Sequence, residues 1–461
     1  MRPARTLPLP LLAAALFYAA PAQADYTICV VGRVQTIDSG KTIPRGPNAG
    51  DTEDYWSNAD SGINKALQGI FVIVDPPQGA DQGEWTDGDG CADFSGSVQN
   101  ANVIIRSRTK RNGNHMILHG QPDTFSPTTS GWSYVFSNQN LNSNQTYTYQ
   151  NIGSGIAKWT ALFTANFTLD RWKNVTTGKY IHLGVDESCV ASPPSARTDN
   201  RASAHYGPGS SASNSQITSG WHYLVLSNCS STLLTRRKSI VSHEVGHALA
   251  ALFYADSSSA ANGDEPNCTD LNNDLDPARS PNSSACTGSS NSYSIYTKEW
   301  NSIAFREGFA HFVAAAAWSD KDDAGRAGSS GTGHEAEFTW FNDPQDLRRY
   351  NQGSGTNNGG RLENICCVEP GSNCSTSWDS AATNGDWMRF LWSYFTDDTC
   401  GSAPTKKEML QIYQRTRLNG GLTKGNYYTR ARTAMRQLVT SSCLRGRWDT
   451  WAMRTGVDND T

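Results

Sequence analysis

The sequence of 461 residues contains no apolar run near the roughly 20 residues needed to span a bilayer, apart from a shorter one at the N-terminus. It also has no excess of positive charge, because 39 Lys and Arg stand against 43 Asp and Glu. We therefore expect neither a membrane-spanning protein nor a nucleic-acid partner, which usually requires a basic face. Only 18% of the residues are charged and 10% are aromatic, which argues against a disordered chain. The length predicts two or three domains.

Residues 1–24 have the features of a secretory signal. Arg2 and Arg5 precede an uncharged, mostly apolar stretch that ends in Ala22–Ala24 (AQA), the small-x-small pattern typical of a cleavage site. We therefore expect the mature chain to start at Asp25. The expected location is secreted, either periplasmic or extracellular, with no membrane span once the signal is removed.

Export changes how the 11 cysteines are interpreted, because an oxidising compartment favours disulfides. The sequence has no C-x-x-C pair, so a cysteine-type zinc site is not indicated. Sequence alone does not fix the connectivity. As hypotheses, Cys29 with Cys91 would staple the first domain, and Cys268 with Cys286 would close a local loop. The odd count leaves one thiol free or paired outside the chain.

Residues 25–125 predict a small antiparallel β-sandwich domain. Residues 126–150, rich in Ser, Asn, Gln and Thr, predict a linker that carries one strand at 132–136. In the first segment β-branched and aromatic residues gather in short runs between Gly, Asp, Asn and Pro clusters. The strands expected from these runs are Tyr26–Asp38, Gly69–Asp75, Asn102–Arg108 and His115–Gly120.

Residues 151–461 combine strands with long helices, which predicts an α+β domain behind the β module. Two Pro-free helices, Leu233–Tyr254 and Thr297–Trp318, flank a Cys-, Asn- and Asp-rich segment, 255–296, that we interpret as a surface insertion. The other elements are expected as strands at Tyr180–Val185 and His222–Leu226, and as helices at Ile156–Phe167, Trp387–Phe395, Thr405–Arg417 and Tyr427–Val439.

The run His243-Glu244-Val245-Gly246-His247 is the pattern H-E-x-x-H, inside the first of the two long helices. At positions i and i+4 the two imidazoles lie one turn apart on one face, near enough to share a metal ion. Glu244 lies about 100° around the helix from His243, so it can reach a metal-bound water without being a ligand. Zinc lowers the pKa of such a water towards about 7, and Glu244 can take its proton. These residues predict metal-assisted hydrolysis of an acyl bond, with one zinc ion as cofactor.

A catalytic zinc ion needs a third protein ligand and an open fourth position. The extended motif H-E-x-x-H-x-x-G-x-x-H is absent, because Phe253 stands where its third His is needed. The best candidate is Glu307, on the second Pro-free helix, which can pack beside the first. Glu299, Asp256 and the acids of the insertion are the alternatives.

Together these motifs resemble the gluzincins, the zinc metallopeptidases whose ligands are two His and one Glu. The run EGFA at 307–310 is similar to the E-G-F-A segment of the aminopeptidase-type gluzincins, whose Glu is the third ligand. The resemblance implies a zincin-like domain with His243, His247 and Glu307 as ligands and Glu244 as general base. The chain departs from those families in spacing, since 59 residues lie between His247 and Glu307 where they have about 20.

A second resemblance lies in the β module. The strand 69–75 (GIFVIVD), followed by the turn 86–94 (TDGDGCADF), resembles the carboxypeptidase regulatory-like β-sandwich. Asp87 and Asp89 in this turn, and the alternating acids of 270–276 (DLNNDLD), offer oxygen ligands for calcium, although Asp-Gly turns are far more common without it. Calcium is therefore a secondary hypothesis.

Acyl-transfer chemistry also needs a group that stabilises the oxyanion. His311 follows Glu307 by one helical turn, so it could hold a ligand through a hydrogen bond or be an ordinary core residue. The sequence selects none of the four oxyanion candidates, which are Tyr394, Tyr350, His334 and Tyr296.

These observations predict a secreted zinc-dependent metallopeptidase acting on protein or peptide substrates. The sequence has no exopeptidase motif such as G-x-M-E-N, which grips a free amine, so an endopeptidase is favoured. An ester or other acyl substrate stays open, since the same residues would hydrolyse it. The alternative from another class is an exported adhesin, or a carbohydrate- or protein-binding protein, with a degenerate, non-catalytic zincin-like domain. The intact Glu244 counts against this alternative.

Overall fold

The computed structural model describes the chain in segments, which are the basis of every structural statement below. They are residues 25–35, 63–111, 114–119, 133–150, 156–172, 180–186, 221–227, 238–254, 298–318, 381–418, 427–455 and 457–458. These segments contain two β-sheets, a two-stranded ribbon and seven helices. The expected α+β class is therefore confirmed.

The smaller sheet has four strands and is centred on β1. Its strands are β1 (Asp25–Val34), β2 (Ile63–Ala66), β5 (Cys91–Ser95) and β9 (Thr146–Tyr149). β1 pairs antiparallel with β2 and β5 and parallel with β9. Cys29 and Cys91 stand opposite each other in the β1–β5 register and form a disulfide, so this hypothesis is confirmed.

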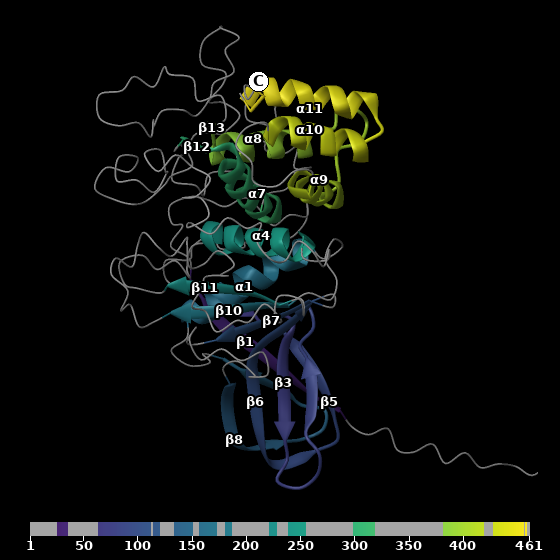
Figure 1. Cartoon of the computed structure of the whole chain (residues 1–461). Coiled ribbons are helices and arrows are strands. Elements are labelled where there is room, and N and C mark those ends of the chain that lie inside the picture. The colour runs from purple at the N-terminus through teal and green to yellow at the C-terminus, as the bar shows by residue number, and fades with distance from the viewer. Residues whose placement is uncertain are drawn as a thin grey trace, which may run out of the picture.

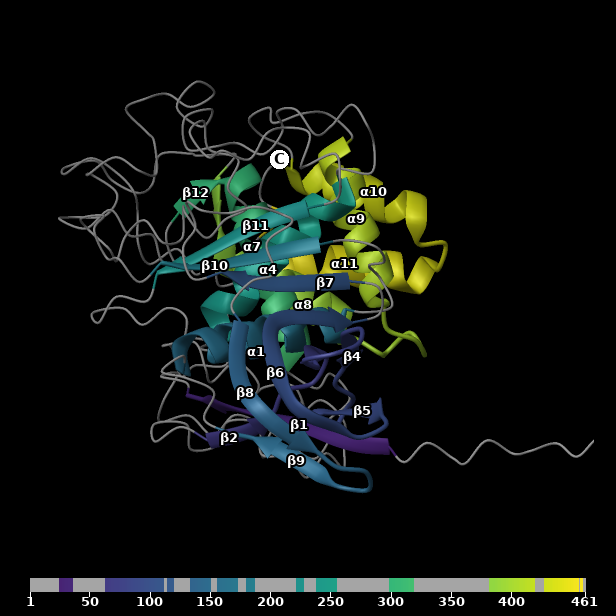
Figure 2. The same ribbon diagram turned by 90° about the horizontal axis from the view of Figure 1, so that it is seen from below.

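The larger sheet has seven strands and branches at β6. Its strands are β3 (Ile70–Asp75), β4 (Gln82–Trp85), β6 (Val98–Arg111), β7 (Asn114–His119), β8 (Ser133–Leu141), β10 (Tyr180–Asp186) and β11 (Trp221–Ser227). The order is β11-β10-β7-β6-β3-β4, and β8 also pairs with β6. The first part of β6 pairs with β8 and its last residues pair with β7, while β7, β10 and β11 run parallel to one another. Seen from below in Figure 2, β10 and β11 continue this sheet beyond β7.

The two sheets draw strands from all three of the expected parts, the β module, the linker and the catalytic domain. β8 and β9 lie within 126–150, the expected linker, and both are paired strands. β10 and β11 belong to the segment expected as the catalytic domain, yet they extend the sheet that β3 and β6 begin. The strand expected at 132–136 overlaps β8, whose side chains are mostly exposed or half-buried, which accounts for the polar composition of this segment.

The helices form layers on the larger sheet, as Figure 1 shows. α1 and α4 lie nearest the sheets, α7 packs on α4, and α8 packs on α7. The helices are α1 (Ile156–Arg171), α4 (Lys238–Tyr254), α7 (Asn301–Trp318), α8 (Asn384–Phe395), α9 (Lys406–Leu418), α10 (Tyr427–Leu438) and α11 (Ser442–Thr455). A short antiparallel ribbon of β12 (Lys298–Trp300) and β13 (Ala381–Thr383) joins the starts of α7 and α8.

Nearly all buried apolar side chains of the described segments form one core that runs from the sheets to the C-terminal helices. Aromatic rings dominate its helical part. The ring of Phe305, for example, lies 4.6 Å from that of Trp387 and 5.0 Å from that of Tyr413. A second disulfide, Cys400–Cys443, ties the α8–α9 connection to α11. Within the described segments, no helix has both the length and the apolar character that crossing a membrane would require.

Candidate metal centre

The helix α4 holds both histidines of the H-E-x-x-H run on one face. It lies in the middle of the molecule and contacts α1, α7, α9 and β11. All its residues from Val241 to Ala250 are buried, so the helix is enclosed rather than amphipathic. The exposed fraction is 5% for His243 and 2% for His247. Two polar rings this deep in a core need polar partners.

The partner helix α7 approaches α4 most closely at Gly246. A Cβ atom at Gly246 would lie 2.8 Å from both Cα and O of Ala310, closer than such atoms can pack. The absence of a side chain at Gly246 therefore allows the two helix backbones to touch. Ala310 lies one turn after Glu307, and Gly246 directly precedes His247, so this contact brings the Glu307 carboxylate to the histidines.

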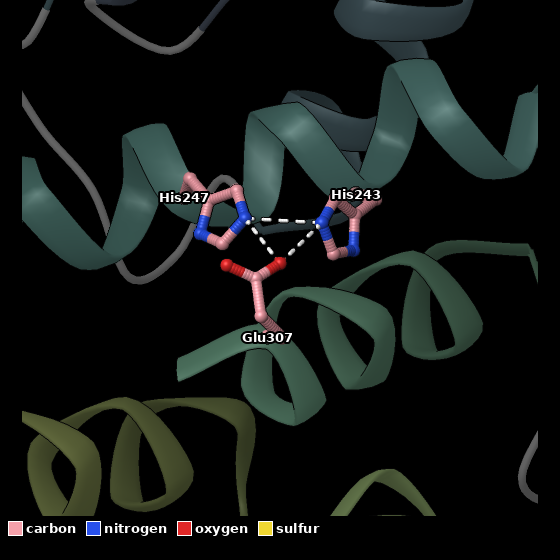
Figure 3. A group of neighbouring side chains, drawn as sticks. All are labelled: His243, His247 and Glu307. Carbon is pink, nitrogen blue, oxygen red and sulfur yellow. Dashed lines mark hydrogen bonds and ion pairs between the residues drawn. The ribbon is translucent and has the colours of Figure 1, made fainter. Parts of the chain in front are cut away.

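Three ligand-type atoms converge between the two helices, as Figure 3 shows. The Nε2 atoms of His243 and His247 lie 3.0 Å apart, and Oε2 of Glu307 lies 3.0 Å from the first and 3.1 Å from the second. Two ligands of one tetrahedral zinc ion are about 3.3 Å apart, given bonds of about 2.0–2.1 Å. Among the described residues, this is the one group of three His, Cys, Asp or Glu side chains that could hold a metal ion.

The chemistry of the three atoms also suits a cation. Each Nε2 of a neutral imidazole carries either one proton or one lone pair, and an ionised carboxylate oxygen carries only lone pairs. Three such atoms at mutual distances near 3 Å leave lone pairs facing one another unless protons or a positive ion lie between them. The site thus fits a metal ion on its geometry and on its donor set.

Burial and neighbouring charges shift the pKa values of His243 and Glu307 so that both residues are in their metal-binding protonation states at neutral pH. Burial, together with the nearby His247, lowers the pKa of His243 from 6.5 to about 4. Burial alone would raise the pKa of Glu307. The charges of His247 and Arg306 and the hydrogen bonds from both histidines outweigh it and hold that pKa well below its usual range. At neutral pH His243 is therefore neutral and Glu307 is ionised, the forms that bind metals.

Glu244, the expected general base, lies next to His243 on α4 and is only 1% exposed. It does not belong to the three converging ligand atoms. A helix turns about 100° per residue, so its carboxylate leaves the chain to one side of the ligand face.

The sequence interpretation missed Arg306, which touches the candidate ligand Glu307. Its Nε and Nη2 atoms donate hydrogen bonds to Oε1 of Glu307, at 3.2 Å and 2.9 Å. Arg306 is the single Lys or Arg in α7, in the middle of a largely apolar helix. That isolated charge next to a candidate buried acid is the signal that could have identified it.

His311, also on α7, packs against the ligand set. Its ring centroid lies 4.1 Å from that of His243, with the two rings tilted by 46°. Burial, and then the charge of His243, lowers the pKa of His311 well below its usual range, so this ring is neutral at pH 7. His311 therefore supports the His243 ring by direct contact.

Of the other candidates, Glu299, Tyr394, Asp87 and Asp89 are among the described residues, and the rest are not. Glu299 lies in β12 opposite Ala382 of β13, and Tyr394 packs its ring 5.0 Å from that of Trp448 among the C-terminal helices. Oδ1 of Asp87 accepts hydrogen bonds from the backbone N–H groups of Asp89 and Cys91, as in an ordinary Asx turn. Those outside the described residues are Asp256, Tyr296, His334, Tyr350, the acids of 270–276 and the pair Cys268 and Cys286.

Comparisons of this chain with protein-family models, with curated proteins and with solved structures find no match. The interpretation of the site therefore stands on its residues and their geometry. What the geometry provides is a buried group of two imidazoles and one carboxylate, with the buried Glu244 next to His243 on the same helix.

Proposed function

We propose that this chain is a secreted zinc-dependent metallopeptidase of the gluzincin type, with a zincin-like arrangement around α4 and α7. The observation that carries the proposal is the convergence of the His243 and His247 Nε2 atoms with Oε2 of Glu307, with Glu244 adjacent on the same helix. Export is supported by the two disulfides and by the signal-like residues 1–24.

The donor set favours zinc over harder ions. Two imidazole nitrogens and one carboxylate oxygen form a ligand set common in catalytic zinc sites, whereas calcium and magnesium prefer oxygen ligands throughout. His243, His247 and Glu307 would hold the ion. When bound there, zinc would supply two effects: a lower pKa, towards about 7, for a water molecule at the site, and polarisation of a substrate carbonyl.

Within this proposal Glu244 moves the proton. Its carboxylate accepts a proton from the attacking water and donates it to the leaving amine of the cleaved peptide bond. A purely structural metal site has no use for such a base. The buried Glu244 therefore favours a hydrolase over a binding protein with a degenerate zincin-like domain, and the missing exopeptidase motif favours internal peptide bonds.

The test compares casein hydrolysis by the exported protein with that by its Glu244→Gln variant, alongside the zinc content of both. We expect one zinc ion in each. Activity in the variant should fall by about 10²- to 10⁴-fold, the usual contribution of a general base. A zinc chelator should abolish activity in the parent protein, and added zinc should restore it.

Two other outcomes would contradict the proposal. A folded protein that binds zinc but hydrolyses neither casein nor an ester substrate, with or without Glu244, would indicate a structural metal site. A folded protein without zinc affinity would leave the exported binding protein as the better interpretation. Glu307→Ala is the companion variant, since it removes a candidate ligand and should lose the zinc itself.

A further inference from the structure

The contact between Arg306 and Glu307 suggests a role that the ligand set alone does not describe. We propose that Arg306 is a positioning residue, which holds the Glu307 carboxylate so that one oxygen alone is presented to the metal ion. This inference rests on the zinc site proposed above.

The two carboxylate oxygens of Glu307 contact different residues in the structure. Oε1 accepts hydrogen bonds from Nε and Nη2 of Arg306, at 3.2 Å and 2.9 Å. Oε2 lies 3.0 Å and 3.1 Å from the Nε2 atoms of His243 and His247. The carboxylate is thus oriented from one side by the arginine and faces the imidazoles from the other.

Burial strengthens the ion pair between Arg306 and Glu307. The side chains of Arg306 and Glu307 are only 11% and 4% exposed, so water and salt screen their attraction weakly. Hydrogen bonds between an ionised donor and an ionised acceptor are about twice as strong as neutral ones. Arg306 therefore fixes the orientation of the carboxylate before any metal ion arrives.

One-oxygen binding matters for the number of ligands around the metal. A carboxylate that is free to rotate can offer both oxygens to one ion, which would fill a position that catalysis needs. With Oε1 engaged by Arg306, Glu307 contributes a single ligand atom. The three protein ligands then leave a fourth, open position for water and substrate.

The test measures zinc affinity rather than hydrolysis. Zinc dissociation constants are determined by competition with a chromophoric chelator for the parent protein and for Arg306→Gln, Arg306→Lys and Glu307→Ala. The matched control is Arg432→Gln. Arg432 also donates two hydrogen bonds to a carboxylate, that of Asp449. This contact joins α10 to α11, and neither helix supplies any of the three converging atoms. Thermal unfolding of each zinc-free variant and the visible spectrum of each cobalt(II)-substituted variant are recorded in parallel.

We expect Arg306→Gln to weaken zinc binding by about 10- to 100-fold, the usual effect of losing a group that orients a ligand. Arg306→Lys keeps the charge but offers a flexible ammonium in place of a rigid fork, so its affinity should lie between those of the parent and Arg306→Gln. The control should bind zinc as the parent does. The cobalt spectrum of Arg306→Gln should shift towards that of a higher coordination number, because Glu307 can then offer both oxygens.

An affinity of Arg306→Gln within twofold of the parent would overturn the inference, even if its thermal stability falls, since a merely structural arginine lowers stability alone. If Arg306→Gln does not fold, the Arg306→Lys affinity decides in the same way. Failure of the proposed function is distinguishable, because it appears in the parent protein, either as absent zinc binding or as absent hydrolysis by a zinc-loaded protein.

Discussion

His243 is the residue at which burial has the clearest measurable consequence. Its pKa is lowered from 6.5 to about 4, because the enclosed ring, beside His247, resists a positive charge. The unfolded chain therefore binds a proton at His243 at a higher pH than the folded chain does. The free energy of unfolding of the zinc-free protein should fall as the pH drops from about 6.5 to about 4, by on the order of 3 kcal/mol from this group.

Urea unfolding of the zinc-free protein at several pH values across that window would measure this loss. The control is His243→Asn, which cannot titrate and should show a correspondingly flatter dependence. Equal slopes for the two proteins would show that His243 is not buried in its neutral form. The low pKa of Glu307 acts in the same direction but at lower pH, since a carboxylate stabilised in its ionised form loses that stabilisation only when it is protonated.

At the scale of single residues, spacing in the sequence predicted which side chains lie together when both belong to the same helix. The i, i+4 relation alone places His243 and His247 on one face, and the structure brings Glu307 to them from the second helix. Arg306 was missed because its role depends on where its side chain folds back, and no spacing rule encodes that.

At the scale of the elements, Gly246 determines how closely α4 and α7 approach. A Cβ atom there would lie 2.8 Å from backbone atoms of Ala310, so Gly246→Ala must push the helices apart. We expect a loss of about 1–3 kcal/mol in the free energy of unfolding, as for other overpacked cores. We also expect a clear loss of zinc affinity, because Glu307 moves away from the histidines with its helix.

Gly446 in α11 is the matched control for this prediction. It is also a helical glycine, but nothing lies within 4 Å of a Cβ atom built there. Gly446→Ala should therefore be neutral or stabilising by up to about 1 kcal/mol, through helix propensity. Chemical denaturation and chelator competition on both variants measure the difference. If Gly246→Ala kept the parent's stability and zinc affinity, the close crossing would not be what assembles the site.

The sequence predicted the existence of these helices better than their meeting point. The long Pro-free apolar patterns indicated both: α4 covers Lys238–Tyr254, residues 233–237 lie outside the described part of the chain, and the residues just before α7 form strand β12. α11 was not predicted, although its buried apolar residues Leu444, Trp448 and Ala452 recur at helical spacing. The α4–α7 crossing depends on surface fit between two segments far apart in the chain, which periodicity within each segment does not contain.

At the scale of the whole molecule, strands from both sides of the expected boundary between β module and catalytic domain share one sheet. β6 is long enough to pair with β8 along its first part and with β7 at its end, and β7 then leads to β10 and β11. One sheet and one core therefore connect the N-terminal strands with the helices that carry the candidate site. Pairing between distant strands is set by backbone hydrogen bonds and register, so composition and local periodicity predict it poorly.

The disulfide Cys400–Cys443 allows global stability to be separated from the candidate site. It closes a loop with a sequence separation of 43 at the C-terminal end of the helical layers, whereas the converging atoms belong to α4 and α7. Replacing both cysteines by Ser should lower the free energy of unfolding by about 4 kcal/mol on the chain-entropy estimate. Zinc affinity at a temperature where the variant is still folded should stay within about twofold of the parent's, because the α4–α7 crossing is packed independently of this bond.

Denaturant unfolding and chelator competition on the double variant would measure both quantities. A parallel fall in zinc affinity would show instead that α8 to α11 hold α7 in place against α4, so that the candidate site would depend on the whole helical layer rather than on one crossing.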